Sequence, residues 1–158
     1  MKVFTLADSS RTDRLGQALA RTRPQHAVVH LEGDLGAGKS TLARALLREL
    51  GVRGAIRSPT YTLVERYPLA GGGEAWHLDL YRIGDTAELE YLGLDSADVT
   101  LWLVEWADRG RGGLPPADLL VQLEIDGDGR RARLSTHSDG GTAWLQRLGQ
   151  DDEITSDS

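Results

Sequence analysis

The 158-residue sequence predicts an α/β fold, a three-layer sandwich with a mixed, mainly parallel central sheet and added antiparallel hairpins. Three observations support this prediction. The first half alternates strand-like and helix-like segments, which is typical of parallel strands joined by helices. The second half contains two pairs of alternating segments joined by glycine-rich turns, which is typical of hairpins. Residues 100–106 form a nearly continuous apolar run, as expected for a strand covered on both faces.

The first half of the sequence is predicted to contain two strand–helix units. Its expected elements are a strand at Val3–Ala7, a helix at 9–24, a strand at Ala27–Gly33 and a helix at Lys39–Gly51. Ser10 is the expected N-cap of the first helix, and Leu15 and Leu19 share one of its faces. Gly51 ends the second helix.

The second half supplies the hairpins. Its expected elements are strands at Tyr61–Tyr67 and Trp76–Arg82, a helix at Asp85–Gly93, a strand at Thr100–Trp106, hairpin strands at Asp118–Asp126 and Arg130–Thr136, and a helix at Thr142–Gly149. Asp85 and Glu88 form a capping box. Residues 1–149 are interpreted as one domain and residues 150–158 as an acidic, disordered tail.

Composition excludes several classes of protein. The chain has no cysteine, so it has neither a disulfide framework nor a thiolate metal site. We expect a cytoplasmic protein without a membrane partner, because neither a transmembrane run nor a signal peptide is apparent. A net charge of −6 argues against a broad nucleic-acid surface. The basic segment Gly129–Arg133 is the one candidate for a local nucleic-acid patch. A solvated hairpin edge is the favoured interpretation, since charged edges oppose sheet aggregation.

The segment "GDLGAGKS" fits the phosphate-loop pattern of a glycine, four residues, a glycine, a lysine and a serine or threonine. A predicted strand precedes it and a predicted helix follows it, which is the required context. Its glycines allow backbone amides to face an anion at the start of a helix. The predicted nucleotide-binding residues here are Gly33, Asp34, Leu35, Gly36, Ala37, Gly38, Lys39, Ser40 and Thr41.

Individual roles follow from the chemistry of these side chains. Lys39 is expected to reach the β- and γ-phosphates, and Ser40 to place its hydroxyl on Mg²⁺. Thr41 begins the helix beside the α-phosphate. The only lysines among 18 basic residues are Lys2 and Lys39, which indicates that position 39 needs a compact ammonium group. ATP is favoured over GTP because the chain has no asparagine and hence no guanine-specific motif.

Two acids are candidates to complete the site. Glu105 directly follows four apolar residues, so we interpret it as a ligand of Mg²⁺ or water, the alternative being an exposed acid at a strand end. Asp79 is interpreted as a catalytic acid, the alternative being a salt bridge to Arg82. His77 is interpreted as a packed polar residue. Thr60 lies in the segment "SPTYTL", where we expect a loop that senses the γ-phosphate. A plain turn leading into a strand is equally compatible with this segment.

These motifs occur in one order: "GDLGAGKST", "SPTYTLVERY", "HLDLYR", "ELEYLGL" and "LVEWADRG". Together they resemble the TsaE (YjeE) family, the small ATPase of bacterial threonylcarbamoyladenosine (t6A) synthesis on tRNA. The resemblance extends from about Leu6 to the last predicted helix. It is far more specific than the phosphate loop alone, which many families share.

The resemblance implies a function and a set of partners. A protein of this kind binds and hydrolyses ATP with Mg²⁺, acts with the TsaB–TsaD complex, resets that complex between turnovers and meets tRNA only indirectly. By matching motif positions, Lys39 contacts phosphates, and Ser40 and Glu105 hold Mg²⁺. Asp79 and Thr60 support hydrolysis or sensing. The remaining nucleotide contacts implied are Trp106, Ser9 and the turn at Gly129.

Two alternatives remain open at this stage. A small-molecule kinase has the same loop and similar size, but it needs a lid with arginines and an acceptor pocket. The segment Arg109–Gly113 is the only lid candidate and is one turn long. A nucleotide-dependent binding module with little hydrolysis differs from an ATPase only in rate. The sequence offers no secure internal arginine finger, so we expect slow hydrolysis that partners alter.

Overall fold

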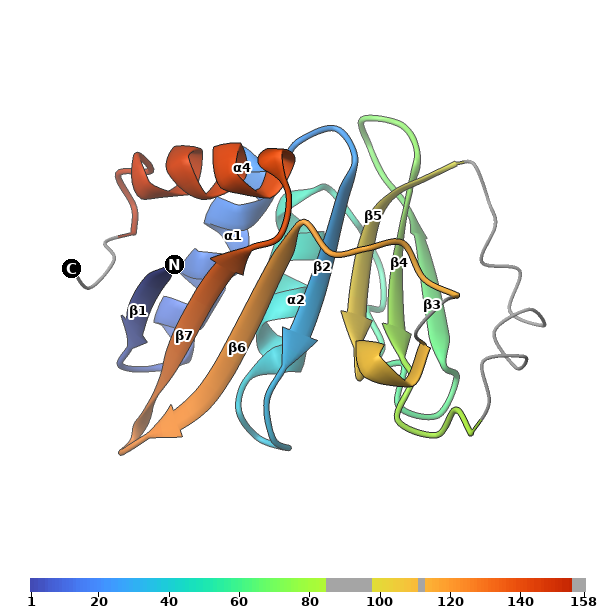
Figure 1. Cartoon of the computed structure of the whole chain (residues 1–158), viewed down its shortest axis with the longest axis horizontal. Helices are drawn as coiled ribbons and strands as arrows, with labels where there is room; N and C mark the ends of the chain where they lie inside the picture. The colour runs from blue at the N-terminus through green and yellow to red at the C-terminus, as the bar shows by residue number, and fades with distance from the viewer. Residues whose placement is uncertain (85–97, 111–112, 155–158) are drawn as a thin grey trace.

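The computed structural model describes residues 1–84, 98–110 and 113–154, where a seven-stranded sheet carries the helices (Figure 1). The elements are β1 (Lys2–Leu6), α1 (Ser9–Thr22), β2 (Ala27–Glu32), α2 (Lys39–Glu49), β3 (Val64–Pro68), β4 (Glu74–Asp79), β5 (Val99–Glu105), η1 (Ala107–Gly110), β6 (Leu119–Asp126), β7 (Gly129–Thr136) and α4 (Asp139–Gly149). No helix in these ranges is long and apolar enough to cross a membrane.

The sheet is mixed, with the strand order β1-β7-β6-β2-β5-β4-β3. Strands β6, β2, β5 and β4 run parallel to one another, whereas β7 and β3 are antiparallel to their neighbours. The predicted α/β class with a parallel centre and antiparallel hairpins is therefore confirmed. Because β2, β4 and β5 are parallel, their carboxyl ends meet at one edge of the sheet, the lower edge in Figure 1. That edge is where ligands bind in folds of this class.

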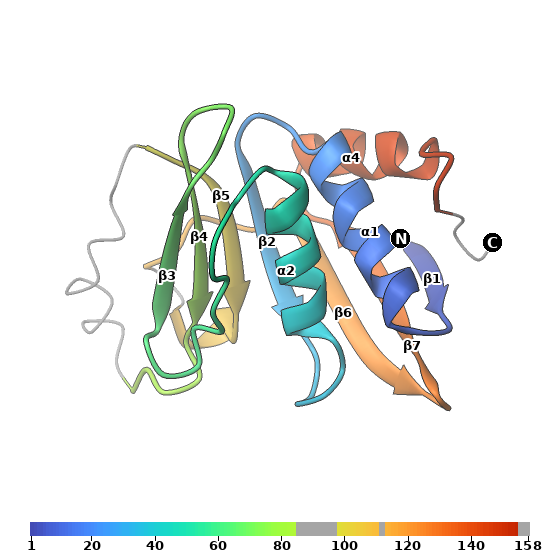
Figure 2. The same cartoon turned by 180° about the vertical axis from the view of Figure 1, so that it is seen from behind.

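Helices α1 and α2 lie side by side on one face of the sheet (Figure 2). Gly16 of α1 permits this close approach, because a β-carbon there would lie 2.7 Å from the carbonyl oxygen of Leu42 in α2. Helix α4 lies next to α1, and the indole Nε1 of its buried Trp144 donates to the carbonyl oxygen of Leu19 at 3.2 Å. The helical layer is thus tied together by close packing and by a buried hydrogen bond.

The two faces of the sheet carry separate cores. Along β5, Leu101 and Leu103 belong to the main core beneath the helices, whereas Trp102 and Val104 belong to a second core. Alternate residues of a strand point to opposite faces, so the second core lies on the face opposite α2. The apolar run was correctly interpreted as a strand buried on both faces.

Several expected boundaries were wrong. The N-cap of α1 is Asp8, whose carboxylate accepts from the amide of Arg11, and Ser10 instead donates its hydroxyl to that carboxylate. Strand β3 begins at Val64 rather than Tyr61. Strand β7 is not an edge, because β1 pairs with it along its outer side. Two basic residues of the hairpin pair with acids of β6: Arg131 with Asp126 at 3.0 Å and Arg133 with Glu124 at 3.5 Å.

Three sequence-based expectations reach beyond the described residues. The predicted helix at 85–93 lies outside them, as do residues 111–112 of the lid candidate and residues 155–158 of the tail. The earlier part of the tail is described. There, Asp151 pairs with Arg21 of α1 at 3.1 Å, and Ile154 packs on the main core.

Candidate nucleotide-binding site

The backbone between β2 and α2 has the conformation expected of a phosphate loop. Gly33, Gly36 and Gly38 have φ angles of 151°, 85° and 106°, which side chains other than glycine rarely adopt. Gly38 is the N-cap of α2, and no side chain caps the helix there. The first amides of α2 are therefore left for a ligand, and the positive end of the helix dipole favours an anion.

We expect Gly33→Ala to destabilise the protein more than Gly36→Ala. Both positions have positive φ, but a β-carbon at Gly33 would lie 2.6 Å from the backbone oxygen of Leu123, whereas nothing lies within 4 Å at Gly36. The clash should add about 1–3 kcal/mol to the cost of the backbone strain. Urea unfolding measures the difference, and equal losses for the two variants would contradict it.

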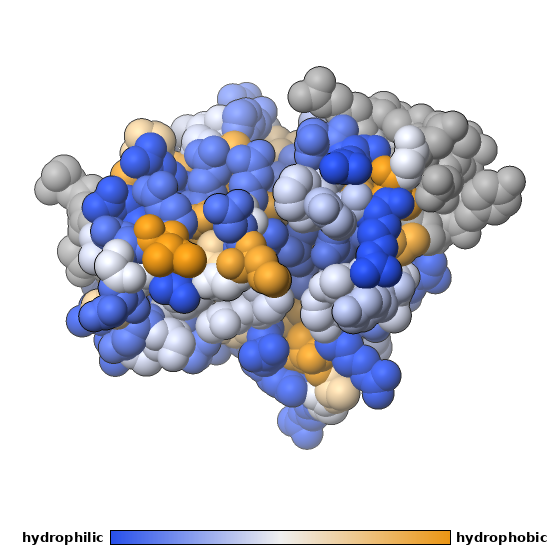
Figure 3. All heavy atoms as spheres, turned by 90° about the horizontal axis from the view of Figure 1, so that it is seen from below, coloured by the Kyte–Doolittle hydropathy of each residue, from blue (hydrophilic) through white to orange (hydrophobic). Residues whose placement is uncertain are grey.

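A cavity of about 630 Å³ opens beside the phosphate loop, at the carboxyl edge of the sheet. Figure 3 views the molecule from this edge, where hydrophilic and hydrophobic side chains both reach the surface. The lining residues are Asp34, Leu35, Gly36, Gly38, Lys39, Ser40, Thr41, Thr60, Asp79, Tyr81, Arg82, Glu105 and Trp106. The structure thus brings together residues from the phosphate loop, the segment after α2 and the ends of β4 and β5.

Four predicted site residues lie outside this lining. Ala37 is fully buried in the main core, and Gly33 faces Leu123 behind the loop. Ser9 begins α1. Gly129 begins β7, packed closely against the backbone of the segment before α1. The other predicted residues line the cavity.

The lone lysine of the loop contacts the acid at the end of β5. Lys39 Nζ lies 3.4 Å from Glu105 Oε1, and the other carboxylate oxygen, Oε2, lies 2.8 Å from His77 Nε2. Burial by itself raises the pKa of Glu105, but the hydrogen bond to His77 and the charges of His77 and Lys39 outweigh burial and lower it. Glu105 is therefore ionised at neutral pH and available to a cation.

Asp79 lies beside Glu105, because the two residues are paired across β4 and β5. Its Oδ1 accepts from the backbone amide of Tyr81 at 3.0 Å. Burial is the largest influence and raises the pKa of Asp79, the hydrogen bond from the Tyr81 amide opposes it, and the neighbouring charge of Glu105 adds to the increase. Among the described residues no ion pair joins Asp79 to Arg82, whose guanidinium lies 4.8 Å from the ring centre of Tyr61. Asp79 is thus a buried carboxylate with increased basicity.

Replacing Asp79 by asparagine should stabilise the nucleotide-free protein at neutral pH by about 1 kcal/mol. The pKa of Asp79 is raised in the folded state, so its charged form is disfavoured there, and asparagine keeps an acceptor for the amide of Tyr81. The gain should disappear as the pH falls below the ordinary aspartate range, where the acid is protonated in both states. Urea unfolding at several pH values tests this prediction. A loss of stability at neutral pH would contradict it.

An aromatic cluster forms one wall of the cavity. Trp106 has a φ of 58°, and its ring lies 5.6 Å from the ammonium of Lys39. The rings of Tyr81 and Trp106 are 4.9 Å apart, and Arg109 lies over both. A bulky residue in this backbone region is strained, and such strain is concentrated at functional sites.

Four residues at or beside the cavity are not among the predicted site residues. Tyr81 and Arg82 line the cavity because they directly follow Asp79, and their position in "DLYR" was an available signal. The sequence analysis interprets His77 as a packed polar residue. Its spacing of two from Asp79, however, places both side chains on one face of β4. Arg130 donates to the carbonyl oxygen of Gly36 at 3.0 Å, and no local signal predicts this contact across 94 positions.

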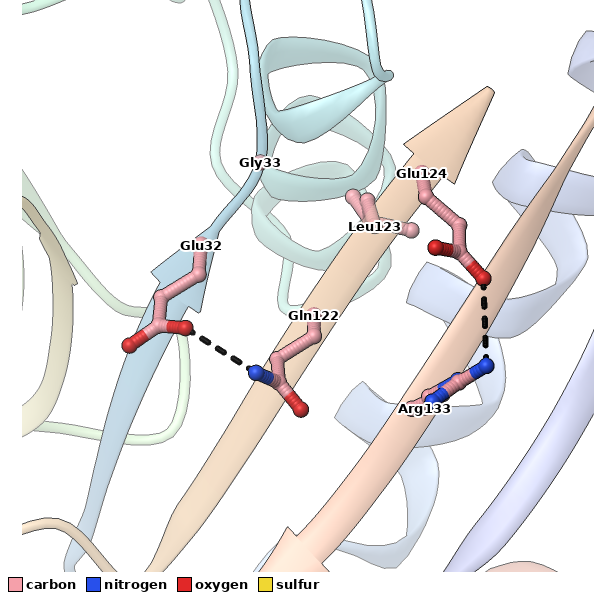
Figure 4. A pocket seen from close by; sticks show the side chains of 6 residues that line it. All are labelled: Glu32, Gly33, Gln122, Leu123, Glu124 and Arg133. Carbon is pink, nitrogen blue, oxygen red and sulfur yellow. Dashed lines mark hydrogen bonds and ion pairs between the residues drawn. The ribbon is translucent and has the colours of Figure 1, made fainter. Parts of the chain in front are cut away.

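A second hollow, of about 230 Å³, lies behind Gly33 (Figure 4). Its polar side chains satisfy one another: Gln122 donates to Glu32 at 3.1 Å, and Arg133 pairs with Glu124 at 3.5 Å. Neither Lys39 nor Ser40 of the phosphate loop lines this hollow, whereas both line the larger cavity. The hollow therefore does not extend the candidate site.

The donors around the cavity suit Mg²⁺ bound together with phosphates. In the part of the chain that the structure describes, no group of three or more histidine or acidic side chains could hold a metal by itself. Mg²⁺ commonly takes one or two carboxylates and completes its shell with phosphate oxygens and water. The Glu105 carboxylate and the Ser40 hydroxyl, which both line the cavity, fit that requirement.

Comparisons with known proteins identify relatives of this chain. The family model described as "Threonylcarbamoyl adenosine biosynthesis protein TsaE" matches residues 6–133. Two of the relatives named tRNA threonylcarbamoyladenosine biosynthesis protein TsaE illustrate the similarity. The one from Haemophilus influenzae is 43% identical over 124 residues, covering 77% of this chain and 78% of that protein. The one from Aquifex aeolicus is 34% identical, covering 85% and 96%.

A solved structure shares the fold. The crystal structure of Bacillus subtilis YdiB superposes with a TM-score of 0.78 at 24% identity, covering 94% of this chain and 93% of that one. The match extends over almost the whole sheet and its helices. Taken with the family model, which covers most of the sequence, these findings show that the chain belongs to the TsaE family.

Proposed function

We propose that this protein binds ATP with Mg²⁺ and hydrolyses it as part of the synthesis of threonylcarbamoyladenosine in tRNA. The observation that carries the proposal is the contact between Lys39 and Glu105 at the mouth of a phosphate loop. The contact supports the proposal because an ammonium that could bind phosphates lies next to a carboxylate that could bind a metal. The names of the relatives support the assignment to tRNA modification.

Binding rests on the backbone and on one side chain. The amides at the start of α2 and the glycine-rich loop would surround the phosphates, and Lys39 would neutralise the β- and γ-phosphates. Thr41 lines the cavity beside Lys39, where its hydroxyl could approach the α-phosphate. A triphosphate would thus exchange the Lys39–Glu105 contact for contacts between Lys39 and phosphate oxygens.

Hydrolysis needs a water molecule, a proton acceptor and charge neutralisation. Water oxygen forms a bond to the γ-phosphorus, the bond to the bridging β–γ oxygen breaks, and ADP, inorganic phosphate and a proton are released. Asp79, with its raised pKa, would orient the water and accept its proton. Ser40 and Glu105 would hold Mg²⁺, which neutralises charge on the phosphate oxygens when bound. Thr60 lines the cavity where it could sense the γ-phosphate.

The turnover of the isolated chain should be slow. Among the described residues that line the cavity, the only arginine is Arg82, and its guanidinium lies against the exposed ring of Tyr61. An arginine that stabilises the transition state typically raises phosphoryl-transfer rates by about 10³–10⁵. We therefore propose that the TsaB–TsaD complex alters ATP hydrolysis and that hydrolysis resets this complex.

Release of phosphate from ATP, measured with and without TsaB–TsaD, tests the proposed function. We expect slow release by the purified chain and a rate that changes by about tenfold or more when the complex is present. Co-purification with and without ATP measures the assembly itself. Rapid turnover by the chain alone would contradict the need for partners. Phosphate transfer to a metabolite, with no effect of TsaB–TsaD, would instead establish a small-molecule kinase.

A further inference from the structure

The carboxylate of Glu105 is held from two sides. Its Oε1 faces the ammonium of Lys39 at 3.4 Å, and its Oε2 lies 2.8 Å from Nε2 of His77. A carboxylate can only accept, so the hydrogen in the second contact belongs to Nε2 of the histidine. Only Lys39 belongs to the phosphate loop. We therefore expect a bound nucleotide to break the contact with Lys39 and to leave the contact with His77 in place.

Lys39 cannot hold Glu105 and a triphosphate equally well. In the proposed function the ammonium turns to the phosphates, and Glu105 then loses the partner at Oε1. His77 has no such competing ligand. It lies in β4, between β3 and β5, and its side chain is only 2% exposed. Close packing limits its rotamers, so its contact with Oε2 should persist when Lys39 moves.

A histidine at position 77 lowers the stability of the folded protein. Its other ring nitrogen, Nδ1, is buried and has no hydrogen-bond partner among the described residues. A buried polar atom without a partner costs about 1–3 kcal/mol, and an apolar side chain of similar shape would avoid that cost. Packing alone therefore gives no reason for a histidine at this position, whereas the contact with Glu105 does.

We propose that His77 is a positioning residue for the metal site: it holds Glu105 by Oε2 and leaves Oε1 to Mg²⁺ once Lys39 contacts the phosphates. This inference rests on the proposed function, because it requires an ATP–Mg²⁺ complex. His77 itself touches neither nucleotide nor metal in this scheme. Partners that hold metal-binding carboxylates typically change metal affinity by about 10–100-fold when they are replaced.

Two amide side chains separate positioning from packing. Glutamine carries its amide nitrogen about as far from the backbone as histidine carries Nε2, so His77→Gln can still donate to Glu105. Asparagine ends near the position of Nδ1, so His77→Asn cannot reach Glu105. A matched control is His30→Asn, because His30 also has a buried ring nitrogen without a partner but lies in β2 and does not line the cavity.

The measurement is the factor by which Mg²⁺ tightens ATP binding, obtained by calorimetry with and without the metal. We expect His77→Asn to reduce this factor about tenfold while changing the affinity for metal-free ATP less than threefold. His77→Gln and His30→Asn should keep the factor within about threefold of the parent chain. Circular dichroism melting establishes that each variant is folded.

The outcomes are distinguishable. If the parent chain binds no ATP, the proposed function fails and this inference fails with it. If the parent chain shows the Mg²⁺ effect and His77→Asn keeps it, only the inference is overturned. Equal losses in the glutamine and asparagine variants would also overturn it, since they would indicate a packing defect. Should His77→Asn not fold, a lost Mg²⁺ effect in folded His77→Gln would overturn the proposal, and a retained effect would support it.

Discussion

Lys39→Ala is expected to weaken ATP binding by about 100-fold or more. Hydrogen bonds to charged groups contribute about 1.5–3 kcal/mol each, and every 1.4 kcal/mol corresponds to a factor of ten. Lys39 is the lysine of the phosphate loop, and its ammonium already faces the cavity beside Glu105. Removing it leaves the loop amides as donors but takes away the charge between the β- and γ-phosphates. Calorimetric titration with ATP and Mg²⁺ measures the loss.

Two control variants test whether the loss of ATP binding comes from the ammonium group of Lys39. Lys39→Arg keeps the charge but replaces a compact ammonium with a planar guanidinium, and we expect it to bind ATP nearly as poorly as alanine. Lys2→Ala removes the other lysine of the chain, which lies in β1 outside the cavity, and should leave binding unchanged. Undiminished binding by Lys39→Ala would show that the nucleotide does not occupy this loop.

Glu105→Ala should have the second large effect, and it should fall on turnover. We expect about a 100-fold or greater loss of ATP hydrolysis, because electrostatic groups at the reacting phosphates typically contribute 10²–10³-fold. Affinity for metal-free ATP should be retained or increased, since Lys39 no longer pairs with a carboxylate in the unliganded protein. Single-turnover phosphate release and calorimetry without Mg²⁺ separate the two quantities.

The matched control is Glu32→Ala. Glu32 ends β2 at the same edge of the sheet, but it is exposed, bonds to Gln122 and does not line the cavity. This variant should hydrolyse ATP within about twofold of the parent chain, as is usual for surface substitutions. If Glu105→Ala also kept normal turnover, Glu105 would be a structural partner of Lys39 and His77 rather than a metal ligand.

Local patterns predicted the centre of the fold well. The strand β2, the loop and the helix α2 are adjacent in sequence, so the glycine pattern and the flanking periodicity determine them together. Strand β7 was misplaced as an edge, because its pairing with β1 joins residues near opposite ends of the chain. The alternation of a strand shows which residues share a face, but it carries no information about which distant strand lies beside it.

The candidate site likewise combines residues that local sequence patterns predict with residues whose roles depend on contacts between distant elements. Glu105 was a candidate because it ends an apolar run, and Asp79 because it is an acid within the segment "HLDLYR". The parallel pairing of β4 and β5 places these two residues side by side. The roles of His77 and Arg130 depend on contacts across elements, with Glu105 in the neighbouring strand and with the carbonyl oxygen of Gly36. Sequence spacing within one element cannot reveal such partners, so chemical type alone left both residues with a passive interpretation.

The position of β1 has a consequence for biosynthesis. Strand β1 is synthesised long before β7, which is its neighbour among the described strands and ends at Thr136. During translation, Lys2–Leu6 therefore stays unpaired with β7 until that strand has left the ribosome. Such distant pairing slows folding, and β1 is meanwhile an exposed strand that neighbouring chains could capture.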